Sequence, residues 1–306
     1  MLLCPPWPSH APPRPRLPLS RAARASPGSS SAAAAPPTQL RLVLETERLL
    51  IVDKPPGLAF HADAGGDGVM QAARSAQASG ALDYSGRLFG VHRLDRGTSG
   101  LLILAKDAES AGLLGYCLRA GSIAKFYVGL SSRRPSKKMG TVSGDMARSR
   151  RSAWKLLRTS ERPAVTNFVS SGVPGADGRP LRAFVLRPRT GRTHQLRVAL
   201  KALGSPVLGD ALYADSAEAA LEERMYLHAA ALRVPPLAPG EPAVEVALCP
   251  NVGAHFAAAP FQAWFAERFP PGSGPDAWCA DSPLLAAPPP AALHWGGEDD
   301  SFDEYA

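Results

Sequence analysis

The chain has 306 residues, of which 45% are hydrophobic, so it can bury one sizeable core or two small ones. The formal net charge is +7, yet residues 1–44 contain five Arg and no acid, while residues 270–306 contain seven acids and neither Lys nor Arg. The segment between them is therefore more basic than the whole chain. Such a charge indicates a polyanionic partner, and the alternative is a merely soluble surface.

Residue content excludes several classes of protein. The four cysteines are widely scattered and form no C-x-x-C pair, which argues against a zinc site and against a disulfide framework. No apolar run reaches the roughly 18 residues that a membrane-spanning helix needs. We expect a soluble, reduced protein that is monomeric and has no membrane partner.

Composition divides the chain into three parts. Residues 1–38 are rich in Pro, Ala, Ser and Arg and contain no acid, which is typical of an organellar transit peptide for the mitochondrion or the chloroplast. The alternative is a disordered tail, because the many prolines oppose a stable helix. Residues 39–269 form the expected folded domain. Residues 270–306 are rich in Pro and Ala and end in acids, which predicts a disordered acidic tail.

The folded domain is predicted to open with two short strands. Residues 42–44 and 49–52 are apolar runs around a polar turn, and the Asp-Lys-Pro-Pro-Gly turn at residues 53–57 closes the second run. A short helix is predicted over residues 70–77. The stretch that follows carries the most informative loop of the chain.

Residues 90–105 place a carboxylate in a charged, glycine-flanked loop before a buried strand. Asp95 lies between Arg93 and Arg96, whose charges favour an ionised carboxylate. The Gly-Thr-Ser-Gly run at residues 97–100 opposes regular structure, and the apolar run at 101–104 predicts a core strand. An Asp on a loop held by a rigid strand can act as a nucleophile or as a general base. The alternative is a purely structural role, in which Asp95 forms ion pairs on a surface loop.

A helix and a second strand follow this loop. Asp107 is a suitable N-cap for a helix that Gly121 would end. Residues 123–130 predict a strand whose alternation puts Lys125 and Tyr127 on one face. A single tyrosine in a strand more often packs than reacts.

Residues 133–158 contain nine basic residues and a single acid, Asp145, with Trp154 among them. Such surfaces bind backbone phosphates, and an aromatic side chain among them can stack on an unpaired base. We therefore expect RNA contact here, and the alternative is a solvated charged loop.

The last predicted elements surround a second polar string. A Gly- and Pro-rich break at residues 172–180 precedes a strand at 181–186, and Thr193 is predicted to cap a helix that ends at Gly204. The start of that helix presents free N–H groups to any anion in front of it. Residues 204–210 and Tyr213 are interpreted as scaffold.

Three strings, in this order, resemble the motifs of RluA-type RNA pseudouridine synthases. They are His92-Arg93-Leu94-Asp95 with Thr98-Ser99-Gly100, then Lys125-Phe126-Tyr127, then Arg192-Thr193-His194-Gln195-Leu196-Arg197. The resemblance covers roughly residues 42–250. It implies that Asp95 is catalytic, that Tyr127 stacks on the target base and that Arg192 pairs with Asp95. It also implies that Leu196 packs beneath the tyrosine and that Arg93 takes the place vacated by the target uridine.

The resemblance further implies fold and activity. The fold would be α+β, with a mixed, largely antiparallel sheet bent around a central active-site cleft and flanked by helices. The activity would be that of an isomerase that converts uridine to pseudouridine in rRNA or tRNA, with no metal and no cofactor. The residues expected to bind RNA or its bases are Arg93, Leu196, Lys125, Arg148, Arg150, Arg151 and Trp154.

Two other classes of function remain open. A non-catalytic RNA-binding protein on the same scaffold would predict loss of Asp95, Tyr127 or Arg192, and all three are present. A metal-dependent hydrolase would draw ligands from four residues, but none of them has the close spacing that is typical of a metal site. Those four are His92, Asp95, His194 and His228.

Overall fold

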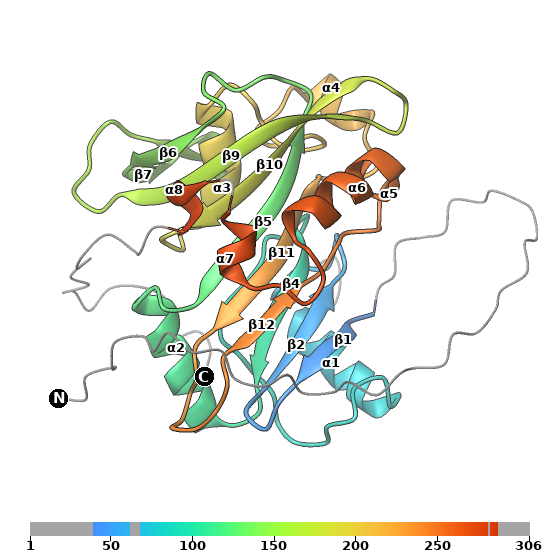
Figure 1. Ribbon diagram of the computed structural model, residues 1–306, viewed down its shortest axis with the longest axis vertical. Coiled ribbons are helices and arrows are strands. Elements are labelled where there is room, and N and C mark those ends of the chain that lie inside the picture. The colour runs from blue at the N-terminus through green and yellow to red at the C-terminus, as the bar shows by residue number, and fades with distance from the viewer. Residues whose placement is uncertain (1–38, 62–67, 281, 287–306) are drawn as a thin grey trace, which may run out of the picture. The chain divides into compact units, whose positions relative to one another are not determined.

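The computed structural model describes residues 39–61, 68–280 and 282–286 (Figure 1). The expected transit peptide at residues 1–38 lies outside the described residues, as do residues 287–306 of the expected acidic tail.

The described strands are β1 (Arg41–Glu45), β2 (Leu49–Lys54), β3 (Phe89–Gly90), β4 (Ser99–Ala105), β5 (Ala124–Ser131), β6 (Met139–Gly144), β7 (Met146–Arg148), β8 (Trp154–Leu156), β9 (Ala164–Pro174), β10 (Pro180–Pro188), β11 (Leu227–Val234) and β12 (Val244–Ala247). The described helices are α1 (Val69–Ala78), α2 (Ala108–Arg119), α3 (Gln195–Ala202), α4 (Ser216–Ala220), α5 (Ala254–Ala257), α6 (Ala259–Arg268), α7 (Pro275–Trp278) and α8 (Pro283–Ala286), with a 3-10 turn, η1, at Arg150–Ser152.

One large sheet organises these elements, in the order β1-β2-β4-β11-β5-β10-β9-β6, with β3 added to β4 and β12 added to β11. Neighbouring strands are antiparallel, except that β4 and β11 run parallel. Strands β7 and β8 form a separate antiparallel hairpin. The prediction of an α+β fold with a mixed, largely antiparallel sheet is confirmed.

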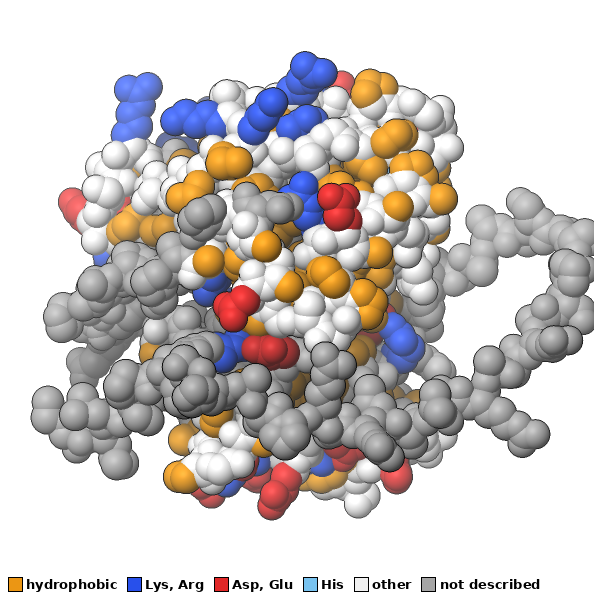
Figure 2. Space-filling model, viewed as in Figure 1, with side chains coloured by type: hydrophobic (Ala, Val, Ile, Leu, Met, Phe, Trp, Pro, Cys, Tyr) orange, Lys and Arg blue, Asp and Glu red, His pale blue; other side chains and the backbone are white. Residues whose placement is uncertain are grey.

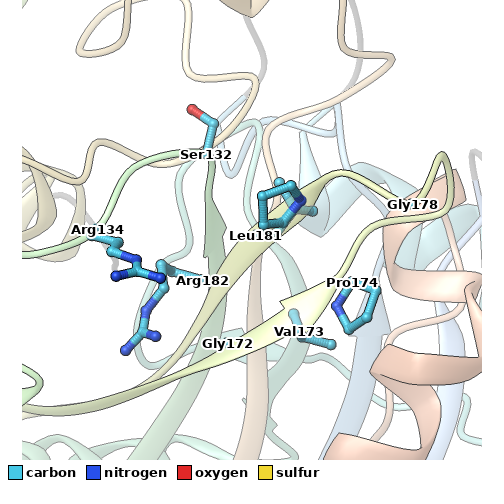
Figure 3. A pocket seen from close by; sticks show the side chains of 9 residues that line it. Ser132, Arg134, Gly172, Val173, Pro174, Gly178, Leu181 and Arg182 are labelled. Atoms are coloured by element: carbon cyan, nitrogen blue, oxygen red, sulfur yellow. The ribbon is translucent and has the colours of Figure 1, made fainter.

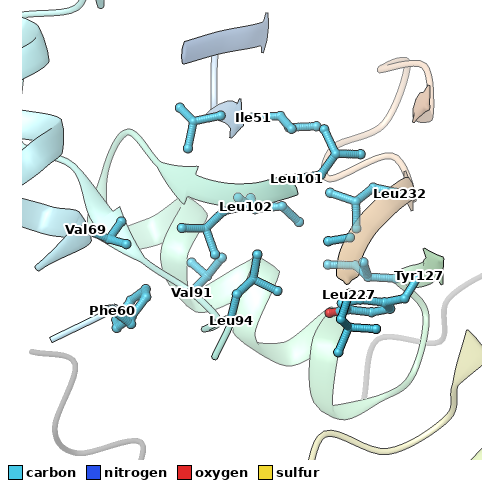
Figure 4. Close-up of a cluster of buried hydrophobic side chains, with 14 of the residues drawn as sticks. Ile51, Phe60, Val69, Val91, Leu94, Leu101, Leu102, Tyr127, Leu227 and Leu232 are labelled. Atoms are coloured by element: carbon cyan, nitrogen blue, oxygen red, sulfur yellow. The ribbon is translucent and has the colours of Figure 1, made fainter. Parts of the chain in front are cut away.

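The two faces of the sheet bury two hydrophobic cores. Leu101 to Leu104 of β4 are completely buried, as a continuous apolar run predicts for a strand covered on both faces. On β5, Tyr127 packs with Leu227 and Leu232 in the first core (Figure 4). Phe126, next to it in sequence, points to the opposite face and packs in the second core with residues of α6 and α7.

Local signals explain where α2 begins and ends. The Asp107 carboxylate accepts the Ser110 N–H at 2.7 Å, an N-cap contact that stabilises a helix by about 1 kcal/mol. Gly121 adopts φ +69°, a left-handed conformation that favours glycine and ends the helix. Both predictions for this helix are confirmed.

Two expectations need correction. Strand β9 continues to Pro174, inside the expected break at residues 172–180, whereas the basic segment 133–158 contributes strands β6, β7 and β8. The folded part also extends beyond residue 270, because Trp278 in α7 is only 4% exposed and packs against Phe126 and Phe269. Apolar burial of these aromatic rings holds α7 on the sheet.

Two exclusions from composition can be compared with the structure. Cys117, Cys249 and Cys279 are free thiols. Among the described residues, no helix has the length and apolar character that crossing a membrane requires.

Candidate active site

Asp95 sits on the loop between β3 and β4, and its neighbours fix that loop. Leu94 is buried and points into the first core, near Val91 (Figure 4). The Asp95 carbonyl accepts the Thr98 N–H at 3.0 Å. His92 is also buried, and its Nε2 accepts the Ile103 N–H at 3.1 Å. A buried residue on each side of Arg93 therefore ties the loop to the sheet and leaves the Asp95 carboxylate partly exposed.

A buried lysine ties the same loop to the turn after β2. The Lys54 ammonium donates to the carbonyls of Pro55 at 2.9 Å, Leu58 at 2.8 Å and Arg96 at 3.3 Å. Burial, and then the charge of Arg224, lowers the pKa of Lys54 to about 7, while Asp95 opposes this shift. Three carbonyl acceptors match the three hydrogens of an ammonium group, so this lysine connects the two loops.

Glycine is required directly behind the loop. Gly100 adopts φ +105°, and a side chain there would collide with the backbone of Ala229 on the adjacent strand β11. The hydroxyl of Ser99 lies 2.8 Å from Nδ1 of His228, also on β11. The strand that follows the Asp95 loop, β4, therefore packs closely on β11.

Asp95 forms an ion pair with Arg197 of α3. The Arg197 Nη1 lies 3.3 Å from Oδ2 of Asp95, and the same guanidinium donates two 2.8 Å hydrogen bonds to the carboxylate of Asp210. The Asp210 side chain is fully buried, whereas that of Asp95 is 20% exposed. The bidentate contact with Asp210 fixes the plane of the guanidinium, so its remaining N–H group is directed at Asp95.

This ion pair corrects the expectation that Arg192 pairs with Asp95. Arg192 lies before α3, where its backbone N–H donates to Oε1 of Gln195 at 3.0 Å. The pKa of Asp145, in the turn before β7, is lowered chiefly by a hydrogen bond from Thr159 and also by the charge of Arg192. The motif was located correctly, but the arginine that contacts Asp95 comes five residues later.

The start of α3 also differs from the expectation. Thr193 was expected to cap the helix, but α3 begins at Gln195 after His194, which adopts φ +57°. The buried Gln195 side chain accepts the Thr190 hydroxyl at 2.8 Å and donates to the Val165 carbonyl at 3.0 Å. Gln195 thus uses both its acceptor and its donors, and these hydrogen bonds hold the turn before α3 against β9. The fixed turn stabilises the uncommon left-handed backbone at His194.

Tyr213 connects the site to the β7–β8 hairpin. Its hydroxyl accepts the Trp154 N–H at 2.8 Å and lies 2.9 Å from Nδ1 of His194. The Arg197 guanidinium lies over the Tyr213 ring, 4.9 Å from its centre. Burial lowers the pKa of His194, and the charge of Asp95 opposes that shift. Asp210 and Tyr213, interpreted as scaffold from the sequence, thus contact the groups that surround Asp95.

Tyr127 lies on the sheet beside Asp95. It is 8% exposed, and its pKa is raised by burial and then by the negative charge of Asp95. Leu196 belongs to the same core, and its packing beneath the tyrosine stays a prediction from the resemblance. Lys125 occupies the same face of β5 and is half-buried, and burial lowers its pKa to about 8.

The exposed or basic residues expected to contact RNA lie on two segments, the Asp95 loop and the segment from β7 to β8. Arg93 is exposed, and its guanidinium lies 3.5 Å from the Thr193 hydroxyl. On the hairpin, the Arg148 guanidinium lies over the Trp154 ring at 5.8 Å, and Arg150 is exposed at the start of η1. Arg151 is the second residue of η1. Because Tyr213 joins the hairpin to α3, these basic residues are connected to the Asp95 site.

The histidines proposed for the hydrolase alternative are used in packing contacts. His92 accepts a backbone N–H, and the two ring nitrogens of His228 lie 2.8 Å from Ser99 Oγ and 3.1 Å from the Leu248 carbonyl. Within residues 39–61, 68–280 and 282–286, no three His, Cys, Asp or Glu side chains form a group that could hold a metal ion.

Known proteins resemble this chain over the same region. The profile of a family described as RNA pseudouridylate synthase matches residues 48–202. An uncharacterized RNA pseudouridine synthase of Haemophilus influenzae is 41% identical over 195 residues, which are 63% of this chain and 81% of that protein. Ribosomal large subunit pseudouridine synthase C of Rickettsia prowazekii is 32% identical, and the match spans 61% of each chain.

A solved structure agrees with these sequence matches. Human RNA pseudouridylate synthase domain containing 1 superposes with a TM-score of 0.58 and 27% identity, over 70% of this chain and 84% of that one. The matched region contains all three motifs and the strands and helix that hold Asp95, Tyr127 and Arg197. The chain therefore belongs to the RNA pseudouridylate synthase family.

Proposed function

We propose that this RNA pseudouridine synthase isomerises a loop uridine of ribosomal RNA and that Asp95 is its catalytic carboxylate. One observation carries the assignment of residues: Asp95 is the carboxylate that is partly exposed, paired with Arg197 at 3.3 Å and close enough to raise the pKa of the buried Tyr127. These are the groups that the reaction needs in one place.

The reaction rearranges one nucleotide without a change of oxidation state. The bond from uracil N1 to ribose C1′ breaks, the base turns, and a bond from C5 to C1′ forms. The proton on C5 is lost and N1 gains a proton, so the atoms balance without a second substrate. A carboxyl group can attack the sugar as a nucleophile, or act on it as a base, only when it is ionised, and we assign this role to Asp95.

Arg197 is the positioning cation. Its two hydrogen bonds to the buried Asp210 prevent it from swinging away, so its charge stays beside Asp95 through the reaction. Tyr127 offers an aromatic face to the detached base on the same side of the sheet. Leu196 and the surrounding apolar residues exclude water, which would otherwise capture a reactive sugar.

The target uridine must leave its stack before Asp95 can reach the sugar. Extrusion of a base costs a few kcal/mol, least when the base is already in a loop. Arg93 is exposed next to Leu94, and we assign it to the space that the uridine leaves. Sequence-selective RNA recognition usually targets loops and bulges, which favours a loop uridine.

Ribosomal RNA is the substrate class that the relatives favour, because one of them is named for the large ribosomal subunit. The test is to map pseudouridines in rRNA and tRNA from cells with and without the gene, and then to add the purified protein to unmodified transcripts. One rRNA pseudouridine that disappears and is restored in vitro supports the proposal. A site that disappears only from tRNA would refute the choice of substrate, and no change in either RNA would refute both parts.

We further propose that residues 1–38 direct the protein to an organelle, since the segment contains four Arg and no acid. A fluorescent protein fused after residue 38 should enter mitochondria or chloroplasts. The same fusion lacking residues 1–38 should stay outside, and identical distributions of the two fusions would contradict the proposal.

A further inference from the structure

A second basic site lies away from Asp95, where β5 ends and β9 turns into β10. A pocket of about 370 Å³ opens there (Figure 3). Its lining residues are Ser132, Arg134, Gly172, Val173, Pro174, Gly178, Pro180, Leu181 and Arg182. Figure 3 shows the Arg134 and Arg182 side chains lying next to each other, from two different segments.

Arg182 is held in place from one side. Its Nη2 donates to the carbonyl and to the hydroxyl of Ser170, both at 3.1 Å. The Ser170 hydroxyl in turn donates to the Lys138 carbonyl at 2.9 Å. The Nε of Arg182 is buried and has no hydrogen-bond partner. The guanidinium is therefore fixed on the edge of the pocket with its hydrogen-bonding capacity incompletely used.

The charges of this site are not balanced. Burial, and then the charge of Arg134, lowers the pKa of Arg182, so the two guanidinium groups repel each other. Among the described residues, neither arginine forms an ion pair with a carboxylate, whereas the adjacent Arg133 pairs with Glu218 at 3.0 Å. Lys137 and Lys138 add two exposed cations to the same loop. Two neighbouring arginines with a forked geometry suit the oxygens of a phosphate group.

The register of the sheet relates this site to the catalytic residues. On β10, Arg182 pairs with Ser131 of β5, and Leu186 pairs with Tyr127. Paired residues of antiparallel strands share a face, so Arg182 is on the same face as Tyr127, four residues or about 13 Å further along.

Helix α3 spans the interval between the two sites. Its first turns carry Arg197, which contacts Asp95. At its other end, the Leu203 carbonyl accepts the Ser136 N–H at 3.1 Å, and the Ser205 hydroxyl donates to the Arg133 carbonyl at 2.9 Å. The loop that carries Arg134 is thus attached to the C-terminal end of α3. Figure 2 shows Lys and Arg side chains gathered at the upper edge of the molecule, near α4 and the end of β5.

We propose that Arg134 and Arg182 form a phosphate-binding site for the RNA backbone, a few nucleotides from the uridine held at Asp95. The inference rests on the proposed function, because it takes RNA as the substrate. The site would contact no base. It would bind the RNA backbone beside the target uridine and so fix the position of the enzyme along the RNA.

The test is a fluorescence titration of the full chain with a 20-nucleotide uridine RNA at several salt concentrations. The variants are Arg134→Ala, Arg182→Gln and the double variant, with Arg134→Lys to restore charge and Arg119→Ala as the matched control. Arg119 is an exposed arginine on α2. Each lost phosphate contact should reduce the slope of log affinity against log salt by about 0.7, which is about five-fold weaker binding at 0.1 M salt. Arg119→Ala should match the wild type, and Arg134→Lys should recover most of the slope.

Thermal unfolding in inorganic phosphate shows whether the site binds free phosphate or the phosphates of the RNA backbone. If phosphate stabilises the wild type but not Arg134→Ala, and all RNA titrations coincide, the site takes free phosphate and the RNA assignment is overturned. Coinciding titrations without any phosphate effect overturn the site itself. If the arginine variants lose affinity while the wild type forms no pseudouridine in any RNA, the proposed function fails and only the phosphate contact with RNA stands. Because Arg134 is exposed, its substitution tests the site even if the Arg182 variant is unstable.

Discussion

The arginines near the two ends of α3 have opposite electrostatic surroundings. At the Asp95 end, Arg197 lies between two carboxylates, and one of them is completely buried. At the other end, Arg134 and Arg182 lie beside each other, and no ion pair with a carboxylate is found for either within the described part of the chain. A group that takes part in a reaction must hold one position, and opposed fixed charges provide this. A group that holds a polyanion needs an excess of charge, which the RNA itself balances.

Removing the negative charge of Asp95 should give the largest difference between the catalytic end of α3 and its RNA-binding end. Asn has the shape of Asp but cannot act as a nucleophile or base, so Asp95→Asn should abolish tritium release from RNA labelled at uridine C5. Its RNA affinity should stay within a few-fold of the wild type or rise, because the basic surface has lost an anion. Undiminished turnover in Asp95→Asn would contradict the proposed role of Asp95 as the catalytic carboxylate. Lost binding by a folded variant would mean that Asp95 serves recognition.

The next largest effect is expected when the fixed cation is removed. Arg197→Ala leaves the buried Asp210 carboxylate without its partner, which should cost about 3–5 kcal/mol of stability in a urea titration, and it should also reduce turnover. Combining Arg197→Met with Asp210→Asn removes both charges and should regain much of the stability without restoring activity.

Arg192→Ala is the matched control, since it removes an arginine five residues earlier in the same motif. It should be more stable and more active than Arg197→Ala, because Arg197 is the residue that contacts both Asp95 and Asp210. The reverse order would return Arg192 to the role that the sequence motif suggested.

Acid should destabilise the folded chain through two buried histidines, His92 beside the Asp95 loop and His228, which contacts Ser99. Burial lowers the pKa of His92 and of His228 from about 6.5 to about 3, with smaller contributions from Lys125 and Arg224 respectively. Below pH 6.5 the unfolded chain therefore binds more protons than the folded one, and stability falls with pH. At pH 5 the loss should reach about 2 kcal/mol for each histidine.

Urea titrations at pH 7 and pH 5 measure this loss. His92→Gln keeps an acceptor for the Ile103 N–H through Oε1 but cannot gain a proton, so it should lose less stability than the wild type on going to pH 5. An equal acid sensitivity in the variant and the wild type would assign the effect to other groups.

The smallest effect is expected from the Tyr127 hydroxyl. If the ring mainly stacks on the base, Tyr127→Phe should keep most of the turnover, whereas Tyr127→Ala should lose about 1–3 kcal/mol of base binding and also leave a cavity in the first core. Single-turnover rates on the same RNA distinguish the two. Equal, complete loss in both variants would give the hydroxyl a chemical role and extend the reactive centre beyond Asp95.

Local patterns predicted much of this architecture. The apolar run of β4, the Asp107 cap and Gly121 are short-range signals, and each produced the element that it predicted. The missed C-terminal helices also carried a signal, since Phe261, Trp264 and Phe265 follow the i, i+3, i+4 spacing of a buried helix face.

The arginine beside Asp95 was harder to predict, because its position depends on contacts across the fold. Arg192 and Arg197 belong to one motif, and spacing alone does not say which of them faces the loop. The choice follows from the left-handed turn at His194, which sets where α3 begins, and from Asp210, which holds the guanidinium of Arg197. The burial of Asp210, which makes its carboxylate need a cation or several N–H donors, is visible only in the structure.

The parallel pairing of β4 with β11 has a consequence for how the enzyme is assembled during synthesis. Ser99 and His228 touch across 129 positions of sequence, and β11 lies between β4 and β5 in the sheet. The strand after Asp95 and the strand of Tyr127 therefore become neighbours only through a segment that the ribosome makes much later. Contacts of such long range form slowly. We therefore expect the strands of Asp95 and Tyr127 to meet only after β11 has been synthesised and inserted between them, and we expect a product that ends before β11 to be inactive on RNA.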